Sequence, residues 1–302
     1  MGKLLAANCF SMTRSKRFWL ALFMMAATGV YMAADISKMK KVADFQGELD
    51  SGLFQSAILL FILLPALGAL FINTDYHDGT IRNKLTVGHT RLAVYLSNLL
   101  MNCAAGVLYL AAYEIVYLLV GFPLLGGLSR PQEFLIKLGM LLLVLLSLTA
   151  IFTLLATLIT NRSVLLYCAL LGMGLVLAAQ IVNARLAAPE MVDDYGGVSY
   201  TTNEDGTVTT QYLDKNGDPI QPEDIPRVPN PSYVKEPMRG FLRTVNNIQP
   251  GGQLVEILED GHREPDGATA QTPYWQLAAY ALAMSLAFTG GGIVLFRRKD
   301  LK

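Results

Sequence analysis

The chain has 302 residues, of which 53% are apolar and 16% are charged, and its 24 Lys and Arg residues balance 24 Asp and Glu residues. Because soluble domains carry roughly a quarter charged residues, this composition argues against a cytosolic enzyme and against a disordered chain. A net charge of zero also argues against a nucleic-acid-binding protein, if the charges are evenly spread.

Six apolar runs with few charges are long enough to cross a bilayer, since about 20 helical residues span roughly 30 Å of hydrocarbon. In chain order they are residues 18–34, 53–72, 92–122, 134–159, 164–182 and 275–296. Pro65 lies inside the second run and predicts a kink. The third run is longer than a span requires and is expected to be tilted or broken near its end. The chain is therefore predicted to be an all-α polytopic membrane protein with six transmembrane helices.

The distribution of Lys and Arg predicts the orientation of these helices. With both termini on one side, the segments on that side carry 12 Lys and Arg against three Asp, and the two short loops on the other side carry five Lys and Arg. Basic residues mark the cytoplasmic side. We therefore expect cytoplasmic N- and C-termini in a multi-pass protein of the cell membrane.

The loop between the second and third runs contains a short predicted helix. Gly79-Thr80 is typical of a helix start and Gly88 of a helix end. The residues between them give this helix mixed basic and apolar faces: Ile81, Lys84, Leu85 and Val87. From the residues alone, the simplest interpretation is a solvated loop helix that lies parallel to the membrane.

Polar residues form a stripe on the third run. At 100° per residue, its members fall within about 100° of one another: Tyr95, Asn98, Asn102, Gly106, Tyr109, Tyr113 and Tyr117. Such a stripe faces protein or a wet cavity rather than lipid. It either packs helices through amide and phenol hydrogen bonds or lines a translocation path or dimer face. Glu114 lies outside the stripe and is either a functional intramembrane acid or a structural one.

In the fourth run, Thr149, Thr153 and Thr157 are expected to bond the backbone or to pack. The three cysteines, Cys9, Cys103 and Cys168, are interpreted as small buried apolar residues.

Residues 184–273 form the one long polar segment, with 7 basic and 15 acidic residues, and are predicted to be extracellular. Thr-, Val- and Tyr-rich runs around an Asp-Gly pair predict a hairpin over 198–212. Residues 214–237 are expected to be turn and linker. The spacing of Met238, Phe241, Leu242 and Val245 predicts a short amphipathic helix, and 253–258 another helical turn. We expect a small α+β extracellular cap between the fifth and sixth spans, packed on the outer ends of the spans.

Motifs of catalysis or cofactor binding are not found in the sequence. No G-x-x-x-x-G-K-[ST] occurs, so the chain is not expected to bind ATP itself, and the three histidines lack metal-ligand spacing. Pro250-Gly251-Gly252-Gln253 is interpreted as a turn. The chain is therefore predicted not to be an enzyme and to bind no cofactor or metal.

Several motifs together resemble the permease family of type-2 ATP-binding-cassette (ABC) exporters, in particular a bacterial, Firmicutes-like subset. The loop motif consists of Asp75, then Gly79-Thr80-Ile81-Arg82-Asn83-Lys84-Leu85, then Gly88, Arg91 and Tyr95. Weaker motifs are residues 14–19, 230–234, 250–253 and 296–301. The resemblance covers the whole chain, although Thr90 stands where the family more often has Ser.

The resemblance implies partners for this chain. Two copies of an ABC ATP-binding subunit would carry the ATP and Mg, and a second permease, identical or homologous, would complete the unit in the membrane lipids. The loop 73–91 would couple ATP-driven movement to the spans through Asp75, Gly79, Thr80, Ile81, Arg82, Lys84, Leu85, Gly88 and Arg91. Residues 1–17 would form a cytoplasmic interfacial helix, whose apolar side is Leu4, Leu5, Cys9 and Met12.

The implied domains are residues 1–17, the five-helix part 18–183, the extracellular domain 184–273, and the last span with its basic tail, 274–302. The leading hypothesis is a permease subunit that exports an amphipathic peptide, drug or lipid-like substrate. The alternative is an ATP-independent membrane protein, either a secondary carrier or a sensory or structural module that uses the acidic cap. A carrier should show inverted repeats or midplane charges, and the sequence offers only Glu114.

Overall fold

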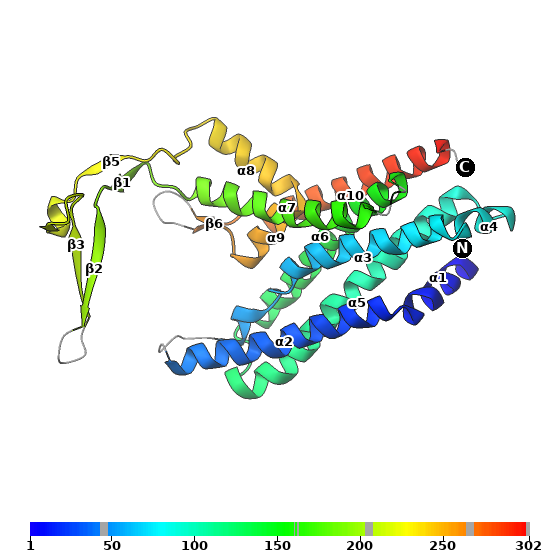
Figure 1. The fold of residues 1–302 in the computed structure, drawn as a ribbon, viewed down its shortest axis with the longest axis horizontal. Coiled ribbons are helices and arrows are strands. Elements are labelled where there is room, and N and C mark those ends of the chain that lie inside the picture. The colour runs from blue at the N-terminus through cyan, green and yellow to red at the C-terminus, as the bar shows by residue number, and fades with distance from the viewer. Residues whose placement is uncertain (43–47, 160, 162, 203–207, 264–268, 300–302) are drawn as a thin grey trace. The chain divides into compact units, whose positions relative to one another are not determined.

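The structure of the chain, a computed structural model, describes residues 1–42, 48–159, 161, 163–202, 208–263 and 269–299. Over these residues it contains ten α-helices and seven short β-strands (Figure 1). The chain divides into two compact units, each described by itself below. The first unit is Met1–Gln180 with Thr244–Gly261 and Gln271–Lys302, and the second is Ile181–Arg243 with His262–Ala270.

Six helices are long and apolar enough to cross a membrane, as the sequence predicts. They are α2 (Lys16–Val42), α3 (Ala57–His77), α5 (Arg91–Leu125), α6 (Pro131–Leu158), α7 (Val164–Leu186) and α10 (Tyr274–Arg298). A 3-10 turn, η1 (Leu49–Gly52), precedes α3, and α3 continues past Pro65. The predicted break near the end of α5 is absent. Pro123 lies in the last turn of α5, and the helix continues to Leu125.

The N-terminal segment forms a separate helix, α1 (Gly2–Arg14), which ends where Ser15 turns extended, with φ −74° and ψ 120°. Its buried residues are Leu4, Asn8 and Met12. The predicted apolar side was wrong at Cys9, which is exposed; Cys103 is only partly buried, and Cys168 alone is buried. Asn8, one turn after Leu4, is buried on the same face of α1. Its amide donates to Ser97 and Asn98 of α5, so this part of the buried face is polar.

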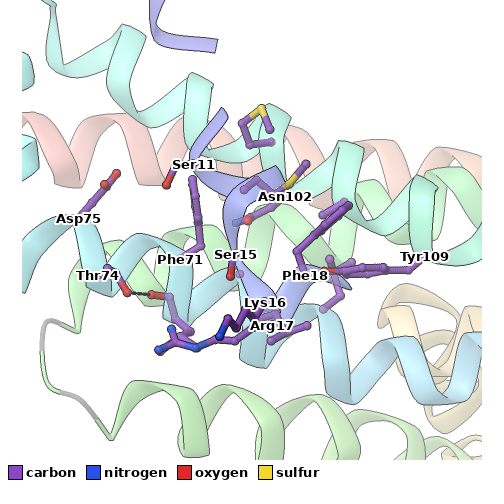
Figure 2. Close-up of a pocket in the computed structure, with 17 residues that line it drawn as sticks. Ser11, Ser15, Lys16, Arg17, Phe18, Phe71, Thr74, Asp75, Asn102 and Tyr109 are labelled. Atoms are coloured by element: carbon purple, nitrogen blue, oxygen red, sulfur yellow. Dashed lines mark hydrogen bonds between the residues drawn. The ribbon is translucent and has the colours of Figure 1, made fainter. Parts of the chain in front are cut away.

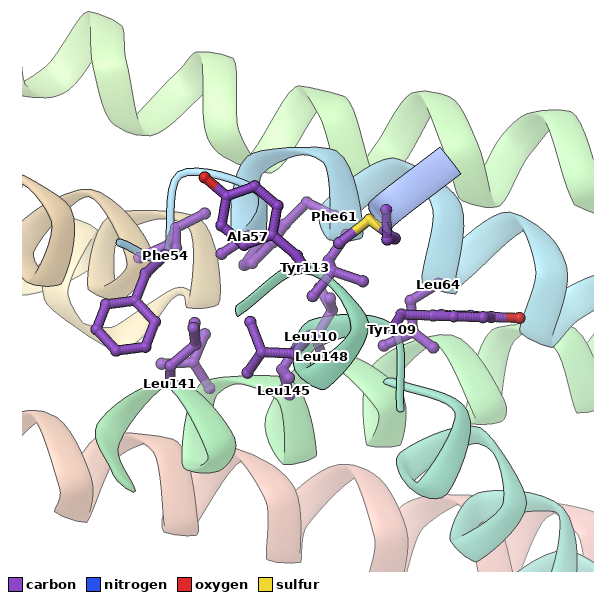
Figure 3. Packing of buried hydrophobic residues seen from close by; sticks show 14 of the residues in the cluster. Phe54, Ala57, Phe61, Leu64, Tyr109, Leu110, Tyr113, Leu141, Leu145 and Leu148 are labelled. Carbon is purple, nitrogen blue, oxygen red and sulfur yellow. The ribbon is translucent and has the colours of Figure 1, made fainter. Parts of the chain in front are cut away.

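The core of the first unit lies where α3, α5 and α6 meet (Figure 3). Phe54 and Phe61 pack here with Tyr113 and Leu148. Small residues let the helices approach closely: a Cβ added at Gly29 of α2 would meet the backbone of α5, and one at Gly172 of α7 would meet that of α3. Thr149 and Thr157 donate to backbone carbonyls one turn earlier, which confirms the interpretation of the threonine row.

The segment predicted to be a turn at Pro250 begins a helix instead, α9 (Pro250–Leu258). Pro250 occupies the first turn, where its missing N–H costs nothing. All residues from Pro250 to Ile257 are buried, and Cβ atoms at Gly251 and Gly252 would collide with the carbonyls of Leu175 and Asn246. The two glycines therefore serve close packing, and α9 belongs to the first unit. The sequence instead placed it in one continuous external domain, 184–273.

The second unit is built from short strands. Strands β2 (Gly197–Thr202) and β3 (Val208–Leu213) pair antiparallel, which confirms the hairpin strands, while the predicted turn lies outside the described residues. Strand β4 (Pro219–Ile220) extends this sheet. Two further pairs join β1 (Met191–Asp193) to β5 (Arg227–Pro229), and β6 (His262–Arg263) to β7 (Thr269–Ala270); η2 covers Pro222–Asp224.

Turn chemistry and ion pairs hold these strands. The carboxylate of Asp214 accepts hydrogen bonds from the backbone N–H groups of Asp218 and Asn216, both at 2.8 Å, and these bonds hold its pKa below the ordinary value. Lys215 pairs with Asp194 at 2.6 Å. The segment after β3 is thus ordered by local polar contacts rather than by an apolar core.

The predicted amphipathic helix is present as α8 (Met238–Ile248), which links the two units. Its apolar residues Met238, Phe241 and Val245 are exposed, whereas Arg239 is buried and donates to the carbonyl of Leu186 at 2.6 Å. The helix is therefore amphipathic as predicted, but its polar side is the buried side and its apolar side is exposed.

Candidate functional site

The loop between α3 and α5 folds into α4 (Thr80–Thr86), as predicted. Gly79 lies before it with φ +67°, and Gly88 follows it with φ +95°. L-residues are strained in this left-handed region, whereas glycine adopts it freely. The two glycines therefore allow the chain to turn before and after α4, which is a short helix between the long helices α3 and α5.

One face of α4 is packed against the first unit. Ile81 is 2% exposed and lies in a cluster with Leu4 of α1, Val94 and Tyr95 of α5, and Phe296 of α10. Leu85, one turn later, packs against the same cluster. The apolar members of the predicted coupling motif, Ile81 and Leu85, thus anchor α4; Ile81 is buried and Leu85 is partly buried.

Lys84 lies on this inner side as well. Its ammonium group contacts the Asp75 carboxylate at 2.5 Å and donates to Asn8 Oδ1 at 2.9 Å. The Asn8 amide in turn donates to Ser97 Oγ at 2.8 Å and to Asn98 Oδ1 at 3.2 Å. Lys84 and Asp75 are only 11% and 15% exposed. We call these five side chains the Lys84 network; it joins α4 to α1, α3 and α5.

Arg91 and Lys299 bind the open ends of other helices. The Arg91 guanidinium donates to the carbonyls of Phe296, Arg297 and Lys299 at 3.2, 2.8 and 2.6 Å, where α10 ends. Lys299 donates to the carbonyls of Thr157 and Leu158 at 2.5 and 3.1 Å, where α6 ends, and burial lowers its pKa. Because helix C-termini leave carbonyls unpaired and favour cations, these contacts fix the loop side of the bundle.

The other face of α4 is exposed. It consists of Arg82, Asn83, Thr86 and Val87, which we call the outer face of α4, and Val87 is 78% exposed. Within the part of the chain that the structure describes, Arg82 forms no ion pair. Val87 was not among the predicted coupling residues. The helical periodicity of the sequence could have identified this face, because at 100° per residue these four positions lie opposite Ile81, Lys84 and Leu85.

Part of the polar stripe on α5 binds the turn before α3. The hydroxyls of Tyr113 and Tyr117 donate to the carbonyls of Gly52 and Leu49 at 2.6 and 2.7 Å. Glu114 Oε1 accepts from the backbone N–H of Phe54 at 3.0 Å, and Phe54 has a φ of +63°. These three hydrogen bonds thus hold the backbone from Leu49 to Phe54. Phe54 is strained, and such a conformation persists only where the surrounding structure supports it.

The rest of the stripe also contacts its own chain. Asn102 donates to Thr153 Oγ1 at 3.1 Å, and the ring of Tyr109 lies 5.5 Å from that of Phe18. Tyr95 lies against Phe296, with ring centroids 6.3 Å apart. These contacts are those of the helix-packing interpretation. A role in a translocation path or dimer face stays a prediction.

Two stripe residues, Asn102 and Tyr109, also line a cavity of about 430 Å³ (Figure 2). The cavity lies between the α1–α2 junction, the second half of α3 and the first half of α5. Its lining is mostly apolar, with Lys16, Arg17 and Asp75 as the charged members.

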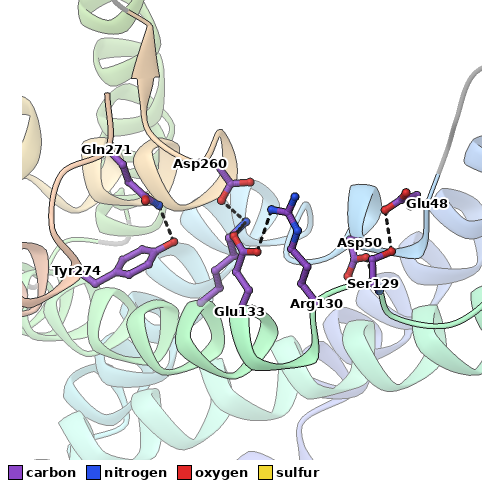
Figure 4. A network of polar contacts seen from close by, with 9 residues as sticks. Glu48, Asp50, Ser129, Arg130, Glu133, Asp260, Gln271 and Tyr274 are labelled. Atoms are coloured by element: carbon purple, nitrogen blue, oxygen red, sulfur yellow. Dashed lines mark hydrogen bonds and ion pairs between the residues drawn. The ribbon is translucent and has the colours of Figure 1, made fainter. Parts of the chain in front are cut away.

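Near the start of α6, charged side chains join α6 to α9 and to η1 (Figure 4). Lys137 pairs with Asp260 at 2.5 Å, and Arg130 with Glu133 at 3.3 Å. Ser129 donates to Glu48 and Asp50, both at 2.8 Å. These contacts line a second cavity of about 270 Å³. Among the described residues, no group of three or more His, Cys, Asp or Glu could hold a metal ion.

The family model for an ABC-2 family transporter protein matches residues 10–301. No curated protein matches the chain. The family match covers nearly every residue and agrees with the six helices that are long and apolar enough to span a membrane. The chain therefore belongs to the ABC-2 transporter family, as a multi-pass membrane permease whose family works with an ATP-binding subunit.

Proposed function

We propose that this chain is the permease of an ATP-driven exporter and that the outer face of α4 docks on the ATP-binding subunit. The observation that carries the proposal is the division of α4 into two faces. Ile81 and the Lys84 network bind its inner side to three long helices, while Arg82 and Val87 remain exposed. A force applied to Val87 is thereby transmitted to α3 and α5 rather than absorbed by a loose loop.

The working unit in this proposal contains two permeases and two ATP-binding subunits, with both chain termini in the cytoplasm. ATP and Mg are held by the partner subunit. The substrate is an amphipathic peptide, drug or lipid-like molecule. The basic residues at the loop side of the bundle support this orientation.

For the α5 stripe we propose a supporting role in the translocation path. Tyr113, Tyr117 and Glu114 hold the turn before α3, and Asn98 belongs to the Lys84 network. The stripe therefore connects both ends of α5 to the elements beside it. In this proposal it stiffens the wall of the path, so that movement of α4 reaches the far end of the bundle.

Co-purification with an ABC ATP-binding subunit, sought among the products of the neighbouring genes, tests the docking proposal. Val87→Asp combined with Arg82→Glu should abolish association and permease-dependent ATPase activity, because a buried contact would receive two unfavourable charges. Arg298→Glu, an exposed basic residue at the end of α10, is the matched control and should retain both. Retained association and coupling in the double variant would disprove docking through this face. Lys84 is unsuited to this test because its replacement disturbs the bundle itself.

A further inference from the structure

The cavity at the α1–α2 junction has the features of a lipid site. We propose that it binds one anionic phospholipid with a hydroxyl-bearing headgroup, taken from the membrane leaflet on the basic side of the protein. The assignment to the cytoplasmic leaflet rests on the orientation proposed above. The binding itself does not depend on transport.

The shape of the cavity follows from how the helices pack. Helix α2 packs mainly on α5 and touches α3 little, so a wedge stays open between α2 and α3. Its volume of about 430 Å³ lies in the roughly 300–1,000 Å³ range of small-molecule sites. The side chains of the wedge are those that suit an acyl chain: Leu64, Leu67, Phe71, Met101 and Ala105. The rings of Phe18 and Tyr109, 5.5 Å apart, lie side by side in its lining (Figure 2).

The charges at the cavity favour an anion. Lys16 and Arg17 are exposed and lie side by side at the cavity (Figure 2), and neither forms an ion pair with another described residue. Asp75 is the one acid in the lining of this cavity, and Lys84 neutralises it at 2.5 Å. A phosphate diester beside the two cations would therefore meet no uncompensated carboxylate in this cavity.

A second, smaller cavity of about 310 Å³ shares Arg17, Leu70 and Thr74 with the first and accommodates the rest of a headgroup. It is lined by Asn73, which is 4% exposed and whose Oδ1 has no hydrogen-bond partner among the described residues, and also by His77 and Asp78. A buried acceptor without a donor is costly. The hydroxyls of a glycerol headgroup supply donors for it and for Asp78, whereas the methylated ammonium of phosphatidylcholine supplies none.

The position of Trp19 agrees with a headgroup at this depth. Its indole is 54% exposed and donates to the carbonyl of Thr13 at 2.7 Å. Tryptophan concentrates at the membrane–water interface. Lys16 and Arg17 therefore lie at the level where lipid phosphates are found.

Native mass spectrometry of the purified full chain in mild detergent tests the proposal. Phosphatidylglycerol and phosphatidylcholine with the same acyl chains are added separately, and bound lipids are counted. We expect one saturable phosphatidylglycerol per chain and far weaker retention of phosphatidylcholine. Lys16→Gln with Arg17→Gln should weaken this binding by on the order of tenfold or more, since each basic residue contributes to anionic-lipid attraction.

Two controls separate a built site from general attraction. Arg297→Gln with Arg298→Gln removes the same charge from an adjacent basic pair outside the cavity and should leave the binding within about twofold. Ala105→Phe and Leu67→Trp fill the apolar wedge at unchanged charge and should both abolish retention. Thermal melting confirms that each variant is folded.

Three results would overturn the proposal: equal retention of the two lipids, equal losses in the two charge-pair variants, or full retention in both folded cavity-filling variants. None of the measurements involves the ATP-binding subunit. A failure here would therefore leave the docking proposal standing, and a failure of docking would leave this site standing.

Discussion

The surroundings of Lys84 determine what a basic residue on this loop helix does. The family resemblance grouped Lys84 with Arg82 among the coupling residues of the loop, but the two side chains have different surroundings in the structure. Lys84 is 11% exposed and binds Asp75 and Asn8, whereas Arg82 is exposed. The difference arises because α1, which supplies Asn8, folds back beside α4 and α5, and no local pattern in residues 73–91 contains that information.

Lys84→Ala should destabilise the chain, because it leaves Asp75 charged and largely buried without its partner. We expect a loss of about 2 kcal/mol, below the roughly 3–5 kcal/mol of a fully buried pair, because both side chains keep some exposure. Thermal unfolding in detergent measures it, and Arg82→Ala is the matched control. Equal melting temperatures for the two variants would contradict the role of the Lys84 network.

Two substitutions of Glu114 should differ in their effect on stability, depending on whether the new side chain can still accept a hydrogen bond. Glu114→Gln keeps an oxygen that accepts from Phe54 N–H, so its effect should be small. Glu114→Leu leaves that buried donor unpaired and should cost about 1–3 kcal/mol. Thermal unfolding of both variants checks the order. If Glu114→Gln were as damaging as Glu114→Leu, the charge rather than the hydrogen bond would be the feature that matters.

At the scale of elements, α4 and α9 differ in how far sequence predicts them. The bounds of α4 follow from Gly79 and Gly88, whose positive φ values end the helix on both sides. The sequence predicted a helical turn over 253–258 but missed the start of helix α9, because Pro-Gly-Gly is typical of a turn wherever its neighbours are unknown. Only the approach of the Leu175 and Asn246 carbonyls explains why two glycines stand in a buried helix.

Gly251→Ala should therefore be severely destabilising. Its new Cβ would collide with the backbone of α7, which cannot move aside as a side chain does. We expect a loss of about 3 kcal/mol or more, at the upper end of overpacking. Gly174→Ala on α7 is the control, because its Cβ would meet nothing within 4 Å, and it should be neutral or slightly stabilising. Similar melting temperatures for both variants would show that α9 does not pack as described.

At the scale of the whole molecule, the net charge of zero is the sum of opposite charges on the two sides of the membrane. In the proposed topology the cytoplasmic segments carry a net charge of +9 and the external segments −8, and Glu114 supplies the remaining −1. Zero net charge therefore does not exclude charged partners. It places basic surface near lipid phosphates and acidic surface outside.

Cysteine labelling tests this topology. In a Cys9→Ser background, a cysteine at Tyr200, which is 71% exposed, should react with a membrane-impermeant maleimide in intact cells. A cysteine at Val87 should react only after the cells are permeabilised. The reverse pattern would invert the topology and remove the cytoplasmic docking face.

The sequence by itself determined the six apolar helices, the short loop helix and the hairpin strands, because each depends on periodicity, length or turn residues within one segment. It also determined the family, since the loop motif is local. The tertiary structure alone decided which loop residues remain exposed, that Arg91 binds the end of α10, and that the α5 stripe holds the turn before α3. Those outcomes depend on contacts between residues tens to about two hundred positions apart, and the burial and pairing of a side chain are set by whatever the rest of the chain brings beside it.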